Sequence, residues 1–194
     1  PSFLVIADCI KVAIPESSTL IHQSKLLGHV APATHTPSGQ NGAGLAAAAR
    51  QVADRGAGGQ LGRELLTTRP TVGPCFARDR SALDITNIEQ IESVLDEAGV
   101  QWVINAAAYT AVDAAETDPE AAREGNAVGP QRLAQACATR GVRLLHISTD
   151  FVFDGTKGQP YCPEDDPNPL GVYGRTKLEG ERAVLGAGGR PLVL

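Results

Sequence analysis

The sequence of 194 residues contains no methionine, not even at its first position, and only four cysteines, Cys9, Cys75, Cys137 and Cys162. The cysteines form no C-x-x-C pair and follow no regular spacing, which argues against a disulfide framework. We interpret them as reduced packing residues of a cytoplasmic protein. No histidine or cysteine spacing is typical of a zinc site, so we predict no metal ligands. Because methionine is absent, we expect a fragment or a processed product.

Long apolar runs and basic clusters are also missing. No stretch approaches the roughly 20 apolar residues that cross a bilayer, and the first residues lack the pattern of a signal peptide. The chain carries 22 acidic and 17 basic residues, for a formal net charge of -5. This balance excludes a basic surface of the kind that binds nucleic acid. With 42% hydrophobic and 20% charged residues, the composition indicates a soluble globular protein without a membrane or nucleic-acid partner.

From about residue 56 onward, apolar strands alternate with helical patterns, which is typical of an α/β fold with a doubly wound parallel sheet. We predict strands at 75–77, 102–104, 142–147 and 191–194, and helices at 63–66, 88–98 and 118–141. A capping box of Thr86 and Glu89 should begin the second helix. The Gly129-Pro130 step should kink or break the third. We therefore divide the chain into an atypical N-terminal segment, 1–50, and a Rossmann-like NAD(P)-binding domain, 51–194, incomplete at both ends.

A glycine-rich turn marks the expected cofactor site. Gly56, Gly59 and Gly62 have the spacing of a dinucleotide-binding loop, in which glycines permit a tight turn and close approach of the backbone to pyrophosphate. Such a loop should follow a buried strand, but Asp54 and Arg55 precede it, and charges are costly inside a parallel sheet. Either residues 3–6 supply the first strand across a long insertion, or that strand is missing. We interpret a second glycine cluster, 39–44, as a linker.

Two motifs near the end of the chain point to catalysis. Tyr173 and Lys177 are four residues apart, so they lie on one face of a helix, where the ammonium can favour phenolate and make Tyr173 a general acid. Thr149 follows the apolar run 142–147, at the carboxyl end of a strand, where open α/β sheets bind ligands. Tyr and Lys at this spacing usually mark only a solvated helix face. Together with the glycine turn, they indicate an oxidoreductase site.

Five blocks carry a specific resemblance: GAGGQLGRELL at 56–66, LDIT at 83–86, VINAAAYTAVDAAE at 103–116, HISTDFVFDG at 146–155 and NPLGVYGRTKLEGE at 168–181. In order and spacing they resemble dTDP-4-dehydrorhamnose reductase, an extended short-chain dehydrogenase/reductase. The resemblance covers residues 56–185. It implies reduction of the 4-keto group of a dTDP-6-deoxy sugar to give dTDP-L-rhamnose, with NADPH or NADH as the cofactor.

The resemblance also implies roles for single residues. Tyr173 would protonate the ketone oxygen, Lys177 would hold the nicotinamide ribose, and Thr149, beside Asp150, would bind the substrate carbonyl. The cofactor would contact residues in four segments: Gly56, Gly59, Gln60, Leu61 and Gly62 at the pyrophosphate; Asp79 and Arg80 at the ribose; Asp84 and Ile85 at the adenine; and Ala106, Ala107 and Ala108 at the adenosine and ribose. The alanines could instead only permit close packing, and Asp84 could only cap its helix.

The choice of cofactor depends on three neighbouring residues. Asp79 would accept a hydrogen bond from a ribose 2′-hydroxyl and repel a 2′-phosphate, which favours NADH, whereas Arg78 and Arg80 beside it favour NADPH. We favour NADPH. The nucleotide sugar is the expected partner, and a homodimer and a divalent ion stay open.

The first 55 residues resemble nothing in the family, and its small C-terminal substrate domain would lie beyond Leu194. We therefore expect the 194 residues alone to bind NAD(P)H weakly or not at all and to reduce no sugar. Three alternatives stay open: a non-catalytic, NADP-binding regulatory subunit like that of methionine adenosyltransferase, another nucleotide-sugar epimerase or dehydratase, and a damaged product without activity.

Overall fold

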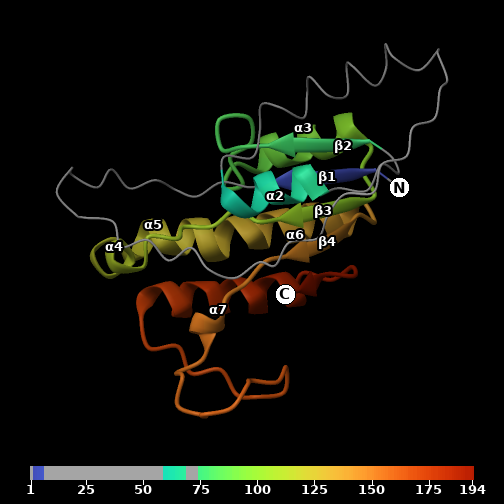
Figure 1. Ribbon diagram of the computed structural model, residues 1–194. Coiled ribbons are helices and arrows are strands. Elements are labelled where there is room, and N and C mark those ends of the chain that lie inside the picture. The colour runs from blue at the N-terminus through green and yellow to red at the C-terminus, as the bar shows by residue number, and fades with distance from the viewer. Residues whose placement is uncertain (1, 7–58, 69–73) are drawn as a thin grey trace.

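A computed structural model describes residues 2–6, 59–68 and 74–194 of the chain. Its centre is a five-stranded parallel sheet with the order β2-β1-β3-β4-β5 (Figure 1). The strands are β1 (Phe3–Ile6), β2 (Cys75–Arg78), β3 (Trp102–Asn105), β4 (Arg143–His146) and β5 (Leu192–Val193). Every neighbouring pair is parallel. The predicted α/β class and parallel sheet are confirmed.

Strand β1 lies inside the sheet, second in the strand order. It pairs with β2 on one side and β3 on the other, and Leu4, Val5 and Ile6 are each at most 3% exposed. Of the two alternatives for the first strand, the insertion is correct and the missing strand is wrong. The reason is that an interior strand of a parallel sheet is covered on both faces, which suits the run Phe-Leu-Val-Ile. The domain boundary at 50/51 stays a prediction, but β1 belongs to the sheet of the second unit.

The helices pack on both faces of the sheet. Leu4 and Ile6 contact the larger core cluster, to which α3 (Ile88–Ala98) and α6 (Gly129–Thr139) contribute, whereas Val5 packs with Leu65 and Leu66 of α2 (Gln60–Thr68). Alternate residues of a strand point to opposite faces, so α2 lies on one face and α3 and α6 lie on the other (Figure 1). Helix α7 (Val172–Gly186) packs beside α6.

The start of α3 differs from the prediction. The residue that caps the helix is Asn87, whose side chain accepts a hydrogen bond from the Gln90 amide at 3.1 Å. The predicted capping box of Thr86 and Glu89 is wrong. The Asp84 carboxylate accepts bonds from both the amide and the hydroxyl of Thr86, at 2.9 and 2.8 Å. Because Asp84 engages Thr86 in this way, the next residue caps the helix.

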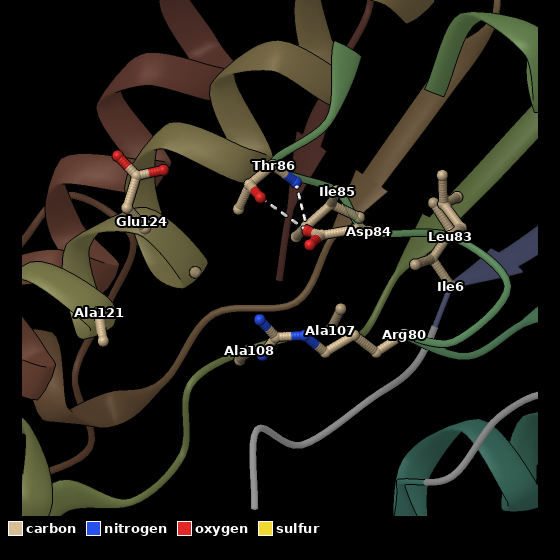
Figure 2. A pocket seen from close by; sticks show the side chains of 11 residues that line it. Ile6, Arg80, Leu83, Asp84, Ile85, Thr86, Ala107, Ala108, Ala121 and Glu124 are labelled. Carbon is tan, nitrogen blue, oxygen red and sulfur yellow. Dashed lines mark hydrogen bonds between the residues drawn. The ribbon is translucent and has the colours of Figure 1, made fainter. Parts of the chain in front are cut away.

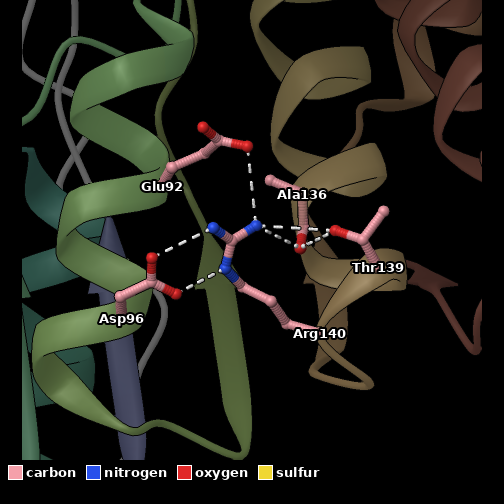
Figure 3. A network of polar contacts seen from close by, with 5 residues as sticks. All are labelled: Glu92, Asp96, Ala136, Thr139 and Arg140. Carbon is pink, nitrogen blue, oxygen red and sulfur yellow. Dashed lines mark hydrogen bonds and ion pairs between the residues drawn. The ribbon is translucent and has the colours of Figure 1, made fainter.

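Ion pairs at the surface connect α3 to Arg140, the residue that follows α6 (Figure 3). Arg140 donates from Nε and Nη2 to the two carboxylate oxygens of Asp96, at 2.7 and 3.2 Å, and its Nη1 lies 3.7 Å from Glu92. The hydrogen bond to Asp96 raises the pKa of Arg140. An exposed pair of this kind contributes little stability. The buried apolar residues therefore hold these helices together, and the ion pairs only align them.

The predicted third helix consists of four segments. They are α4 (Val112–Thr117), α5 (Pro119–Arg123), a π-helical segment η1 (Glu124–Val128) and α6. Asp118 caps α5 by accepting from the Ala121 amide at 3.2 Å. The break predicted at Gly129-Pro130 takes the form of η1, because Pro130 has no N–H for the Asn126 carbonyl and Gly129 bonds to Glu124 instead. Among the described residues, no helix is long and apolar enough to cross a membrane.

Candidate active site

A pocket of about 220 Å³ lies at the carboxyl edge of the sheet (Figure 2). Its walls come from residues at or just after the ends of three strands: Ile6 ends β1, Arg80 follows β2, and Ala107 and Ala108 follow β3. The chain leaves β1 toward β2 and returns to β3 on the opposite side, so this is the topological switch point where open α/β sheets bind ligands. The remaining lining residues are Leu83, Asp84, Ile85, Thr86, Ala121, Glu124 and Gly125.

The pocket combines apolar walls with a few polar groups. Arg80 supplies a cation, and Asp84 supplies a carboxylate that binds Thr86 (Figure 2). Partial burial by itself would raise the pKa of Asp84, but the hydrogen bonds from Thr86 outweigh it, and Arg80 and Arg132 add to the lowering. Asp84 is therefore ionised at neutral pH. Apolar walls with a small number of oriented polar groups are typical of a site for a small organic ligand.

Most of the predicted cofactor residues after β2 and β3 meet in this pocket. Arg80, Asp84, Ile85, Ala107 and Ala108 all line it. The amide of Ala106 donates to the Ile6 carbonyl at 2.7 Å, which ties the ends of β3 and β1 together beneath it.

Asp79 makes different contacts. Its Oδ1 accepts from the Ser81 hydroxyl at 2.6 Å and from the Ala82 amide at 3.1 Å. These bonds, the one from Ser81 above all, lower the pKa of Asp79. Of the three residues weighed for cofactor choice, Arg80 lines the pocket, whereas Asp79 and Arg78 do not.

The glycine turn is described only in part. Gly56 lies outside the described residues. Gly59 directly precedes α2 and its carbonyl accepts from the Arg63 amide at 3.2 Å. Gly59 and Gly62 are buried, whereas Gln60 and Leu61 are exposed at the start of the helix. The first amides of a helix point outward unpaired, so this end can receive an anion.

Tyr173 and Lys177 lie on α7 with both side chains buried, at 9% and 1% exposure. The Lys177 ammonium donates to the Ile147 carbonyl at 2.6 Å. Burial lowers the pKa of Lys177 to about 8, while the charge of Glu181 acts in the opposite direction. The Tyr173 ring meets the Phe151 ring edge to face, with 5.6 Å between the centroids. The predicted pair therefore faces the segment that follows β4.

Thr149 and Asp150 lie in that segment. The Thr149 hydroxyl accepts from the Phe151 amide at 3.2 Å and caps the short 3-10 helix η2 (Asp150–Val152). It also lies 3.3 Å from Asp150 Oδ1. Gly174 allows α7 to approach closely, because a Cβ there would lie 2.3 Å from the Phe151 carbonyl oxygen. The structure thus brings the Thr149 segment against the helix that carries Tyr173 and Lys177.

Asn126 joins the pocket side to α7, and sequence reasoning missed it. Its side chain is fully buried and bonds both the amide and the carbonyl of Tyr109, at 2.8 and 3.1 Å. Its Nδ2 also donates to the Thr176 hydroxyl at 3.2 Å, which in turn donates to the Tyr173 carbonyl at 2.9 Å. No local pattern in the sequence marked Asn126, because its partners lie 17 and 50 residues away. Glu124 and Gly125, from the same π-helical segment, line the pocket.

A second buried polar pair connects β3 with β4. The Asn105 amide nitrogen lies 3.0 Å from His146 Nδ1, and Asn105 Oδ1 accepts from the Ala107 amide at 3.1 Å. Since Oδ1 is an acceptor, Nδ2 must donate to His146. Burial lowers the pKa of His146 to about 3, and the nearby Lys177 charge adds to the effect. His146 is therefore a neutral support beneath the site. Within the described ranges, no three His, Cys, Asp or Glu side chains are grouped as metal ligands.

Comparisons with known proteins agree with this geometry. A family model described as the RmlD substrate binding domain matches residues 50–194. The dTDP-4-dehydrorhamnose reductase of Mycobacterium tuberculosis (strain CDC 1551 / Oshkosh) is 49% identical over 137 residues, which cover 68% of this chain and 44% of that protein.

Two solved structures are similar as well. The dTDP-4-dehydrorhamnose reductase of Clostridium acetobutylicum has a TM-score of 0.67 and 39% identity, over 70% of this chain and 49% of that one. The enzyme of Bacillus anthracis, solved in complex with NADP, has a TM-score of 0.67 and 36% identity, over 70% and 48%. The chain thus spans just under half the length of each of these relatives.

Proposed function

The chain belongs to the RmlD substrate binding domain family, and from this premise we propose that it forms the cofactor-binding and catalytic part of an NADPH-dependent reductase. Membership in this family confirms the resemblance seen in the motifs. The proposed reaction converts dTDP-4-dehydrorhamnose (dTDP-4-dehydro-6-deoxy-L-mannose) to dTDP-L-rhamnose. The observation that carries the proposal is the position of Lys177, which is buried on the Tyr173 helix and bonded to Ile147, two residues before Thr149.

The residues present suit a nicotinamide dinucleotide. The switch-point pocket would receive the adenosine end, with Asp84 and Ile85 at the base and Ala106, Ala107 and Ala108 along the ribose. The amides from Gly59 to Gly62 would meet the pyrophosphate. Arg80 in the pocket wall favours a 2′-phosphate, and the Asp79 carboxylate, which would repel it, is bonded to Ser81. This supports NADPH, the reduced form of the cofactor bound by the Bacillus anthracis relative.

The side chains on α7 and after β4 would supply position and charge. The bound cofactor supplies the hydride that reaches the ketone carbon. Tyr173 gives its phenolic proton to the ketone oxygen, and the Lys177 charge, one helical turn away, stabilises the phenolate that remains. Lys177 would also bind the ribose next to the nicotinamide. Thr149 donates its hydroxyl to the carbonyl oxygen and so orients the ketone, with Asp150 beside it.

The test separates binding from turnover. NADPH fluorescence measures cofactor binding by the 194-residue chain. Turnover is measured in a chimaera that continues the chain with the remaining half of the Mycobacterium tuberculosis relative. Tyr173→Phe in the chimaera should lower turnover by about two orders of magnitude or more with little change in NADPH affinity, the usual scale for general acid catalysis. Near-normal turnover by this variant would refute the role of Tyr173. NADPH binding without any turnover would favour the regulatory subunit.

The same proposal includes the substrate that the chain binds and the compartment in which it acts. The nucleotide sugar is the proposed partner, and the cytoplasm is the proposed compartment. Cys75, Cys137 and Cys162 are free thiols, as a reducing compartment maintains them. Since β1 supplies an interior strand of the sheet, one of the two reasons to expect weak or no NAD(P)H binding is removed. That the 194 residues alone reduce no sugar stays a prediction.

A further inference from the structure

Two side chains, one helical turn apart, tie α7 to the end of β4. Lys177 donates to the Ile147 carbonyl at 2.6 Å. Four residues further along the helix, the Glu181 carboxylate accepts a hydrogen bond from the Ser148 hydroxyl. Ile147 and Ser148 are the two residues immediately before Thr149. The connection therefore joins the helix of Tyr173 and Lys177 to the residue proposed to orient the ketone.

Ser148 is held from its other side by the sheet. Its amide donates to the Leu194 carbonyl at 2.6 Å, and the Leu194 amide donates to the His146 carbonyl at 3.0 Å. The backbone of Ser148 thus continues the pairing of β4 with β5, while its side chain reaches α7. A residue fixed by both the sheet and the helix leaves little freedom for Thr149, its neighbour in the chain.

The charge of Glu181 has a second consequence at this point. The Lys177 ammonium is buried, which disfavours its charged form, and the Glu181 carboxylate on the same helix partly offsets that cost. Among the described residues, Lys177 also lies near the neutral His146 on β4, and Tyr173 is one turn earlier on α7. Glu181 therefore both anchors Ser148 and stabilises the ammonium beside it.

We propose that Glu181 is a positioning residue of the reductase site, which, through Ser148, sets the position of Lys177 and Tyr173 relative to Thr149. The inference rests on the proposed function. The inference gives a role to Glu181 and Ser148, neither of which was a candidate site residue in the sequence analysis. Neither residue has to touch the cofactor or the sugar, since each acts through the side chains that do.

The test measures NADPH affinity by fluorescence titration of the 194-residue chain. Glu181→Ala and Ser148→Ala should each weaken NADPH binding by about tenfold, the scale of one lost hydrogen bond to a charged group. The double variant should bind no more weakly than Glu181→Ala alone, because both changes remove the same bond. Glu181→Gln should restore part of the affinity, since its amide oxygen can still accept from Ser148 but it no longer carries the charge that stabilises the Lys177 ammonium.

A matched control lies on the same helix. Glu179 pairs with Arg123 on the exposed surface, at 2.7 Å, so Glu179→Ala should leave NADPH affinity unchanged. If Glu181→Ala does not fold, Ser148→Ala, which removes a single oxygen atom, carries the test with the same expected loss. A fall in melting temperature with wild-type NADPH affinity would show a purely structural role and overturn the inference alone. A wild-type chain that binds no NADPH would overturn the proposed function, and the inference with it.

Discussion

Acid should unfold this protein earlier than its surface charges alone would, because a histidine is buried in the neutral form. His146 is fully buried on β4, and its Nδ1 accepts from Asn105. Its other ring nitrogen has no hydrogen-bond partner among the described residues. Burial lowers the pKa of His146 from 6.5 to about 3. In the unfolded chain, His146 therefore takes up a proton near pH 6.5, whereas in the folded chain it takes up a proton only near pH 3.

The sign and the size follow from that difference. Between pH 6.5 and about pH 3 the unfolded state binds one more proton at this site than the folded state. The free energy of unfolding thus falls as the pH falls, by about 1.4 kcal/mol per pH unit. Going from about pH 7.5 to about pH 5, this one group should remove about 2 kcal/mol. That is a large part of the roughly 5–15 kcal/mol that stabilises a typical domain.

The assay compares urea unfolding of the wild type with that of His146→Gln across this pH range. Glutamine does not titrate, and its amide oxygen can still accept from Asn105. The carboxylates titrate alike in both proteins, so the difference between the two free energies of unfolding isolates His146. When the pH is lowered from about 7.5 to about 5, the free energy of unfolding of the wild type should fall by about 2 kcal/mol more than that of His146→Gln. A constant difference across the range would mean that the folded protein protonates His146 readily, and would refute the reasoning.

Two further predictions concern packing and cofactor choice. Gly180→Ala should lower the free energy of unfolding by about 1–3 kcal/mol or more, because its Cβ would lie 2.0 Å from the Asn126 carbonyl oxygen. The control is Gly186→Ala on the same helix, where no heavy atom lies within 4 Å of the added Cβ; it should be neutral or stabilising by up to about 1 kcal/mol. If urea unfolding shows equal losses for both variants, the close contact of Gly180 with Asn126 does not matter for stability. Arg80→Ala should weaken NADPH binding about tenfold and NADH binding little, since only NADPH carries the 2′-phosphate. An equal loss for both cofactors in fluorescence titrations would show that Arg80 does not recognise that group.

Local sequence patterns predicted the positions of most strands, one helix start and the candidate catalytic residues. Apolar runs of three residues located β2, β3 and β5, and the largely apolar segment 142–147 located β4, because strands of a parallel sheet covered by helices are mostly apolar. The spacing of Tyr173 and Lys177 placed both on one helix, and the order of five motifs identified the family. Asp118 was predicted correctly as a helix start, since a cap depends on residues within one turn.

Contacts between distant residues were decided only in three dimensions. Phe3–Ile6 became an interior strand between β2 and β3, although β2 begins about seventy residues later, since no local period specifies a neighbour across an insertion. Asn126 bonds Tyr109 and Thr176, which lie 17 and 50 residues away. Ser148 and Glu181 meet across 33 residues. Periodicity and caps record interactions within a few turns, whereas a buried polar group obtains its partners from whichever segments the packed core brings beside it. The sequence alone therefore indicated the reacting side chains, and the tertiary structure decided what holds them in place.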